Sequence, residues 1–209
     1  MNLGEAQAEL SARGFEYLPA ARQTIMLNDA LQELEDFWNW PWLRKTVTGA
    51  TPLQISDLKA VLKVYDSNHN ELQGLSDYDD FDTTDTGTPT NWWIDDTGGT
   101  PTLIAYPVGT ATLSVRYLRD SDLLANSGDT PDIPARYAHI WIDLAVARAY
   151  EDSDNFAAAA QIRNTAQQRM IGLVARYENR DMQTSPQRVR FVDSIAVTTV
   201  GSKDVKIRF

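Results

Sequence analysis

The densest group of potential ligands in the sequence is an acidic stretch between residues 77 and 96. No lysine or arginine interrupts its seven aspartates: Asp77, Asp79, Asp80, Asp82, Asp85, Asp95 and Asp96. Several carboxylate oxygens at close spacing are what hard cations such as Ca²⁺ require. However, a calcium-binding loop that began at Asp77 would need glycine at its sixth position and glutamate at its twelfth, where this sequence has Asp82 and Thr88. We therefore expect no metal site. The stretch fits a solvated acidic loop or, if several copies line a channel, a wall that repels a polyanion.

The sequence contains few residue patterns that are typical of catalytic sites. The two histidines are His69, in a predicted turn, and His139, in a predicted helix, and we expect neither to act as a catalytic base. No phosphate-binding glycine loop, dinucleotide fingerprint, nucleophile elbow or zinc-binding helix motif occurs. The chain has no cysteine, which excludes a disulfide scaffold, a thiolate metal site and a cysteine nucleophile. The sequence therefore predicts a protein that is not an enzyme and binds no cofactor.

Tryptophan is abundant, and we expect most of the six to anchor a core or an interface. Pro41 lacks an amide proton and disfavours helix at the residue before it, so the chain must turn there. Adjacent strand residues point to opposite faces, so we expect one of Trp92 and Trp93 to be buried and the other to face a partner. The predicted structural anchors are Trp38, Trp40, Pro41, Trp42 and Trp141.

The elements that would hold these residues follow from hydrophobic periodicity. A helix is predicted over about 20–39, with apolar residues at steps of three and four and with Glu33, Glu35 and Asp36 off that stripe. Strands are predicted at 58–65, 71–73, 92–95, 102–106 and 110–118, the first two joined as a hairpin. Two helices, about 134–152 and 154–180, would form an antiparallel pair.

Together these elements predict an α+β fold that is mainly α. We expect an antiparallel helix bundle over residues 1–182 that carries a small inserted antiparallel β-sheet at about 46–118. Residues 183–209 would form an extended β-type C-terminal arm. Such a strand-like segment needs a sheet to pair with, either in its own domain or in another chain.

Charge is unevenly distributed along the chain. The 29 acidic and 19 basic residues give a net charge of −10, which argues against a protein that coats nucleic acid. Residues 1–155 hold 25 acidic and 10 basic side chains, a net charge of −15, whereas residues 156–209 hold 4 and 9, a net charge of +5. This asymmetry suggests two surfaces with different partners. No apolar run is long enough to span a membrane and the first residues do not form a signal peptide, so we expect a cytoplasmic protein.

A series of short motifs resembles one protein family when their order is considered. The motifs are Trp-Pro-Trp-Leu at 40–43, the aspartate run at 77–82, Gly-Thr-Pro-Thr-Asn-Trp-Trp at 87–93, Tyr-Pro at 106–107, Leu-Ser-Val-Arg-Tyr at 113–117, Pro-Asp-Ile-Pro-Ala-Arg-Tyr at 131–137 and Ala-Val-Ala-Arg-Ala-Tyr-Glu-Asp at 145–152. Over roughly residues 20–180 the sequence resembles the head-to-tail connector adaptors of tailed bacteriophages.

The resemblance implies a structural role in the virion neck, after assembly in the host cytoplasm. Family members form a ring, commonly of twelve subunits, beneath the portal; the ring extends the channel through which double-stranded DNA passes without sequence-specific binding, and it supports stopper or tail proteins. The C-terminal segment would be an arm that binds the portal or a neighbouring subunit through Val189, Phe191, Val205, Ile207, Phe209, Arg188 and Arg190. The acidic cluster that would face the channel or the tail comprises Asp77, Asp79, Asp80, Asp82 and Asp85.

Two alternatives remain open at this point. One is a tail-tube adaptor of a short-tailed phage, which shares the general build. The other, from a different class, is a carbohydrate-active protein that uses Asp79 and Asp82 as paired carboxylates and Trp92 or Trp93 as a sugar platform.

Overall fold

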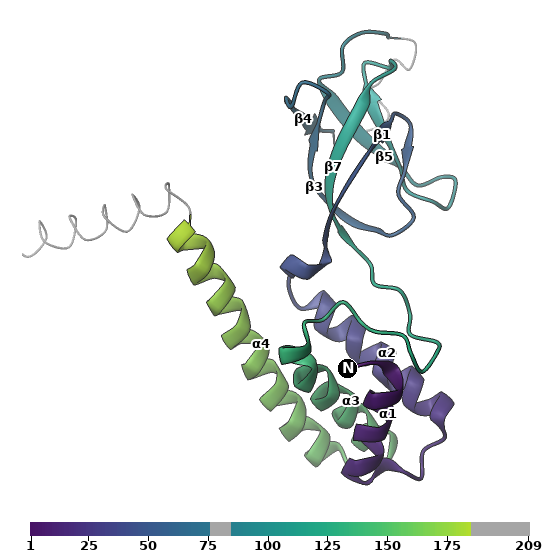
Figure 1. Cartoon of the computed structure of the whole chain (residues 1–209), viewed down its shortest axis with the longest axis vertical. Helices are drawn as coiled ribbons and strands as arrows, with labels where there is room; N and C mark the ends of the chain where they lie inside the picture. The colour runs from purple at the N-terminus through teal and green to yellow at the C-terminus, as the bar shows by residue number, and fades with distance from the viewer. Residues whose placement is uncertain (76–84, 185–209) are drawn as a thin grey trace, which may run out of the picture. The chain divides into compact units, whose positions relative to one another are not determined.

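The computed structural model describes residues 1–75 and 85–184, without the side chains of residues 180–184 (Figure 1). The chain divides into two compact units, Met1–Ala138 and His139–Phe209. The predicted arm at 183–209 falls almost entirely outside the described residues, as do Asp77, Asp79, Asp80 and Asp82. These parts of the sequence analysis stay predictions.

The first unit begins with two helices, α1 (Leu3–Leu10) and α2 (Ala20–Asp36). The side chain of Asn2 accepts a hydrogen bond from the backbone of Glu5 and the side chain of Glu5 accepts one from the backbone of Asn2, which satisfies two otherwise unpaired amides at the start of α1. Helix α2 buries the predicted apolar stripe, including Leu27, and ends three residues before the predicted end. A side-chain hydrogen bond from Gln7 Nε2 to Thr24 Oγ1, at 2.9 Å, links the two helices.

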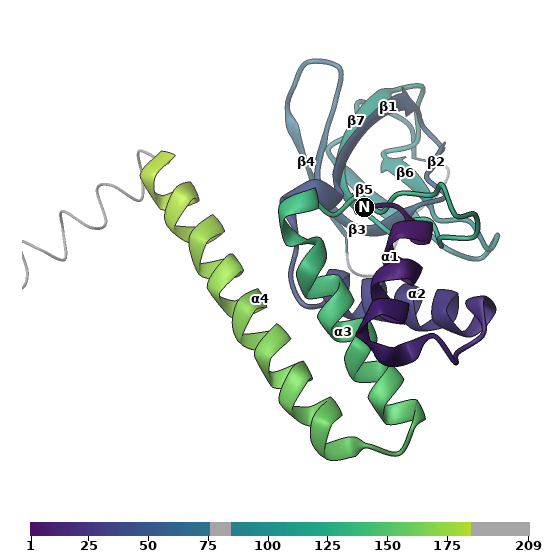
Figure 2. The same cartoon turned by 60° about the horizontal axis from the view of Figure 1, so that its bottom comes forward.

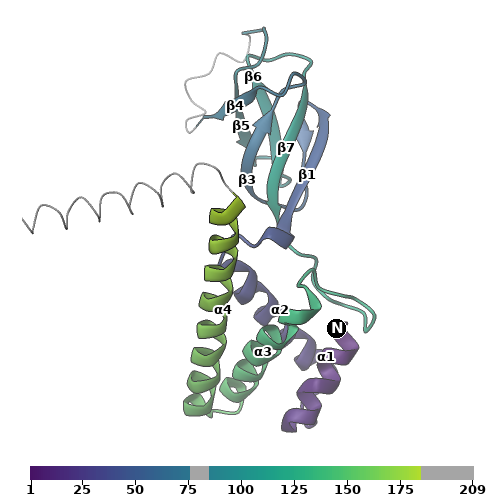
Figure 3. The same cartoon turned by 60° about the vertical axis from the view of Figure 1, so that its left-hand side comes forward.

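The same unit contains a seven-stranded mixed sheet. Its strands are β1 (Arg44–Ala50), β2 (Leu53–Gln54), β3 (Leu58–Tyr65), β4 (Glu71–Gly74), β5 (Asn91–Asp95), β6 (Thr102–Tyr106) and β7 (Thr112–Arg119). Their order is β1-β7-β3-β4-β5-β6-β2, and all neighbours are antiparallel except β4 and β5. Figure 3 shows β7 between β1 and β3. The inward side chains form one core: Ile55, Val64, Leu72, Leu103, Ala105, Leu113, Val115 and Tyr117.

The sheet curls into a nearly closed barrel because its two outermost strands are consecutive in the chain. Thr51, between β1 and β2, donates its backbone N–H to the carbonyl of Ala111 at 3.0 Å, just before β7. Its hydroxyl accepts the backbone N–H of Ala105 in β6, also at 3.0 Å. One residue therefore connects both ends of the sheet and leaves less strand edge exposed than an open sheet would.

The predicted helix bundle with a small inserted sheet is wrong, because the barrel is a major element of the first unit. The strands predicted at 58–65, 71–73, 92–95, 102–106 and 110–118 are present as β3 to β7, with small shifts at their ends. The prediction missed β1 and β2. Strand β1 has the sequence Arg-Lys-Thr-Val-Thr-Gly-Ala and is largely exposed, so it lacks the apolar alternation that identifies a strand.

The second unit contains most of α3 (Ala138–Asp152) and all of α4 (Phe156–Thr184). The break between them lies at the predicted place, and Asp154 there has φ 58°. Ion pairs Glu151–Arg163 and Asp143–Arg169 join the two helices. Helix α4, with 29 residues, is nearly twice as long as α3 and runs on past its start (Figures 2 and 3). None of the described helices is both long enough and apolar enough to span a bilayer.

Candidate functional site around α2, β3 and β7

The predicted functional groups lie mostly outside the described residues. The arm residues Arg188, Val189, Arg190, Phe191, Val205, Ile207 and Phe209 belong to the part of the chain that the structure does not describe. Of the acidic cluster, only Asp85 is described. Its carboxylate accepts a hydrogen bond from the Tyr106 hydroxyl at 3.1 Å, and its backbone carbonyl accepts the N–H of Val108 at 2.9 Å. Asp85 is thus held against the end of β6.

The predicted tryptophan anchors form an aromatic group where α2 leads into β1. Trp40 is fully buried, and its indole N–H donates to the carbonyl of Leu34 at 2.6 Å. The ring of Trp42 stacks on it at 4.6 Å between centroids, and Trp38 packs edge-on at 5.2 Å. Pro41 starts a short 3₁₀ turn, Pro41–Leu43. These contacts direct the chain from the helix into the sheet. Trp141, the remaining predicted anchor, is fully buried in α3.

The neighbouring tryptophans of β5 do not form an exposed sugar platform. Trp93 is buried, and Trp92 is half-buried against the barrel core. The indole N–H of Trp92 donates to the carbonyl of Leu72 at 3.3 Å, and its ring lies 3.0 Å from where a Cβ on Gly74 would stand. Any larger residue at position 74 would press on the Trp92 ring. Both rings therefore serve packing.

A polar network that sequence reasoning missed connects the end of β7 with α2. Glu35 is only 5% exposed, and the Ser121 hydroxyl donates to its Oε1 at 2.5 Å. Burial raises the pKa of Glu35 above its ordinary value, although the Ser121 hydrogen bond and the charges of Lys59 and Arg119 oppose that rise. No local spacing reveals this contact, because Glu35 and Ser121 are 86 residues apart.

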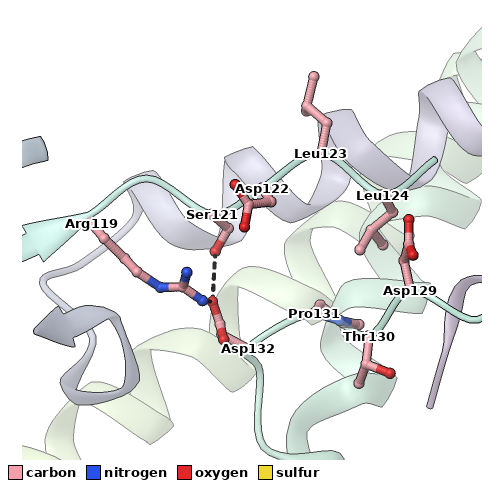
Figure 4. Close-up of a pocket in the computed structure, with 9 residues that line it drawn as sticks. All are labelled: Arg119, Ser121, Asp122, Leu123, Leu124, Asp129, Thr130, Pro131 and Asp132. Carbon is pink, nitrogen blue, oxygen red and sulfur yellow. Dashed lines mark hydrogen bonds and ion pairs between the residues drawn. The ribbon is translucent and has the colours of Figure 1, made fainter. Parts of the chain in front are cut away.

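Ser121 also lies between two cavities. One, of about 290 Å³, is bordered by Arg119, whose guanidinium pairs with Asp132, and by Ser121, whose hydroxyl is 3.4 Å from the Asp132 carboxylate (Figure 4). The other, of about 350 Å³, is bordered by Glu35 and by the ion pair of Lys59 with Asp36. Within residues 1–75 and 85–184, no group of three or more metal-ligating side chains is assembled. The network thus ties elements together instead of presenting a metal centre.

A second polar contact joins β1, β7 and the turn before β3. Asp57 accepts a hydrogen bond from Lys45 Nζ at 2.7 Å and one from the Tyr117 hydroxyl at 2.8 Å. Burial alone would raise the pKa of Asp57, but these two hydrogen bonds outweigh it and hold the pKa below its ordinary value. Burial and the adjacent carboxylate raise the pKa of Tyr117 to about 12.

Basic residues are concentrated on three adjacent strands of the barrel. Strands β1, β3 and β7 hold six of the ten basic residues found in residues 1–155, and no acidic residue: Arg44, Lys45, Lys59, Lys63, Arg116 and Arg119. Four of the six are ion-paired to carboxylates outside these strands.

Comparison with known proteins identifies one family. The family model described as SU10 adaptor protein matches residues 1–190, which include parts of both units. No curated protein matches the chain.

Proposed function

Since the chain belongs to the SU10 adaptor protein family, and is on that account a phage adaptor protein, we propose that it forms a ring at the head-to-tail junction of a tailed bacteriophage. The ring would lie beneath the portal, extend the DNA channel and support the stopper or tail proteins. The role is structural, with no catalytic step. The observation that carries the proposal is the extent of the family match, residues 1–190 of 209, which is the chain nearly as a whole.

The charge distribution supports a DNA conduit. Proteins that grip DNA neutralise several phosphates with lysine and arginine, and their affinity rises with the number of such contacts. Residues 1–155 instead carry a net charge of −15. An acidic channel wall would leave the DNA free to slide, which a duct requires.

The C-terminal segment is proposed as the portal-binding arm. Residues 185–209 hold five basic and two acidic residues, in contrast with the acidic remainder of the chain. Opposite charges between the arm and its binding surface would speed and orient docking. The apolar residues Val189, Phe191, Val205, Ile207 and Phe209 would supply the buried contacts.

Binding to the cognate portal tests this proposal. The full chain and a truncation after Thr184 are each mixed with purified portal and analysed by sedimentation. We expect the full chain to co-sediment with the portal and the truncated chain, although folded, to remain free. A full chain that never joins the portal, even in assembled particles, would rule out the proposal. Attachment to a tail tube without portal contact would favour the tail-tube adaptor of a short-tailed phage.

A further inference from the structure

The barrel carries opposite charges on two sides. Strands β1, β7 and β3 are adjacent and hold six basic residues and no acidic residue. The register places Arg44, Lys63 and Arg116 on their outer surface, which we call the basic wall. Strands β4, β5 and β6 are also adjacent, and the described parts of the stretch that contains them, 66–75 and 85–106, hold five acidic residues and no lysine or arginine. In the strand order, β7 and β5 stand at the centres of the two groups. Since the sheet curls on itself, the two groups face away from each other around the barrel.

Two arginines of the basic wall are available to a partner. Lys45, Lys59, Lys63 and Arg119 pair with Asp57, Asp36, Glu71 and Asp132. Arg44 and Arg116 are exposed, and no ion pair within the described ranges 1–75 and 85–184 involves either of them.

The register of the sheet places these arginines on one surface. Arg116 is opposite Thr46, and Arg44 is two residues from Thr46, so all three side chains lie on the same face of the sheet. The guanidinium of Arg116 lies 5.5 Å from the centre of the Tyr65 ring. This cation–π contact keeps the guanidinium over the Tyr65 ring. The alternate residues Val47 and Val115 pack into or against the core, which confirms that Thr46 and Arg116 face outward.

The opposite side of the barrel offers fixed carboxylates; we call Asp85, Asp95 and Asp96 the acidic wall. Asp95 accepts hydrogen bonds from the Thr97 backbone at 2.9 Å and from the Thr97 hydroxyl at 2.6 Å. These bonds keep the pKa of Asp95 below its ordinary value, so it stays charged at neutral pH. Asp96 is exposed beside it, and Asp85 is held by Tyr106.

We propose that the basic wall of one copy binds the acidic wall of a second copy, and that this contact joins neighbouring barrels head-to-tail. The inference rests on the proposed ring. A head-to-tail contact needs two different, complementary surfaces on each subunit. In a closed ring, every such surface is covered by its complement on a neighbouring subunit. The two opposite walls of the barrel provide such surfaces, and every subunit carries one of each. Charge complementarity between them also disfavours the wrong pairings, basic on basic and acidic on acidic.

A second copy fits the basic wall better than nucleic acid does. Outside strands β1, β3 and β7, residues 1–155 hold 25 acidic and only 4 basic residues. Two unpaired arginines would therefore have to hold a polyanion against the repulsion of the surrounding surface. A second copy would meet the same wall with Asp95 and Asp96 beside the start of β6 and Asp85 beside its end.

Charge reversal in the full chain tests the contact. Arg44→Glu with Arg116→Glu reverses the basic wall, and Asp85→Lys with Asp96→Lys reverses the acidic wall. Each pair should weaken self-association at least about tenfold, because like charges then meet across the contact. The variant with all four changes keeps the net charge of −10 and should restore association. Arg13→Glu with Arg22→Glu, in the helical part, changes the net charge as much as the first pair and should have little effect.

Cross-linking gives a second readout, because the natural chain has no cysteine. A Cβ at Gly98 or at Gly128 would meet nothing within 4 Å, so cysteine fits at both places. On oxidation, Thr46→Cys with Gly98→Cys should give a ladder of covalent multimers. Thr46→Cys with Gly128→Cys, the matched control, should give no ladder, and Thr46→Cys alone should give at most dimers.

The possible outcomes distinguish failure of this contact from failure of the proposed function. Rings that form normally with the basic wall reversed, or that give no ladder with the Thr46 and Gly98 cysteines, would overturn the contact and leave the adaptor role intact. A chain that forms no ring even on the portal would overturn both. If reversal of the basic wall lowers retention of double-stranded DNA and leaves self-association unchanged, the wall is a nucleic-acid surface and the proposal is wrong.

Discussion

The hydroxyl of Thr51 accepts the backbone N–H of Ala105 at 3.0 Å, across 54 residues of sequence. This hydrogen bond holds the β1–β2 connection to β6, while the backbone of Thr51 bonds to Ala111 next to β7. Thr51 therefore fixes the connection between the two outermost strands to a neighbour on each side.

Loss of the Thr51 hydroxyl should loosen the barrel. Thr51→Val keeps the shape of the side chain but leaves the Ala105 amide without its acceptor, which should lower the free energy of unfolding by about 1–3 kcal/mol. Thr51→Ser keeps the hydroxyl and should cost less. Urea denaturation of both variants checks this, and equal losses would show that the hydrogen bond is unimportant.

Truncation of Trp40 should be among the most damaging single changes in the first unit. Its indole is fully buried, stacks on Trp42 and bonds to Leu34. Trp40→Ala should lower the free energy of unfolding by about 3–5 kcal/mol, because it removes a large buried ring and leaves a cavity. Trp38→Ala, at a half-buried position, is the comparison and should cost less in the same denaturation experiment.

Glu35 should make stability depend on pH in the direction opposite to most carboxylates. Its pKa in the folded chain is raised above the ordinary 4.5, mainly by burial, so the folded state binds the proton more tightly than the unfolded state. Its contribution to stability therefore improves as pH falls through the folded pKa. Glu35→Gln keeps an acceptor for Ser121 and removes the buried charge. The variant should be more stable than the natural chain at pH 7, with a difference that shrinks towards pH 4; a difference independent of pH would contradict this.

Asp57 should behave in the reverse way. Its folded pKa lies below the ordinary 3.8, so it stabilises the fold above that pH and loses the effect as pH falls through the folded pKa. Asp57→Asn should therefore lower the melting temperature at pH 7 and have less effect at pH 3. Thermal unfolding at several pH values measures both, and an undiminished effect at pH 3 would show that charge is not the cause.

The sequence predicted those elements whose signal is local. The stripe that includes Leu27 and Leu34 identified α2, and the alternating run from Leu58 identified β3. Strand β1 was missed because its residues are mostly exposed and polar, and its place is decided by pairing with β7, more than 60 residues away. Because β1 and β2 were both missed, the prediction had too few strands to indicate a barrel.

Prediction from local sequence patterns also failed for the single residues of the polar network. Glu35 lies off the predicted apolar stripe of α2, yet it is buried. It is buried because Ser121, which follows β7, supplies its hydrogen bond. Long-range pairing of this kind leaves no periodic signal in either segment. The acidic stretch and the arm were visible from composition, and their roles remain predictions.

An image of the assembled virion neck tests the central claim most directly. Single-particle reconstruction of the head–tail junction, with this chain traced in the density, should show a closed ring of copies directly beneath the portal and around the DNA. Particles in which the chain is absent from the junction, or is present there as isolated copies that form no ring, would contradict the account.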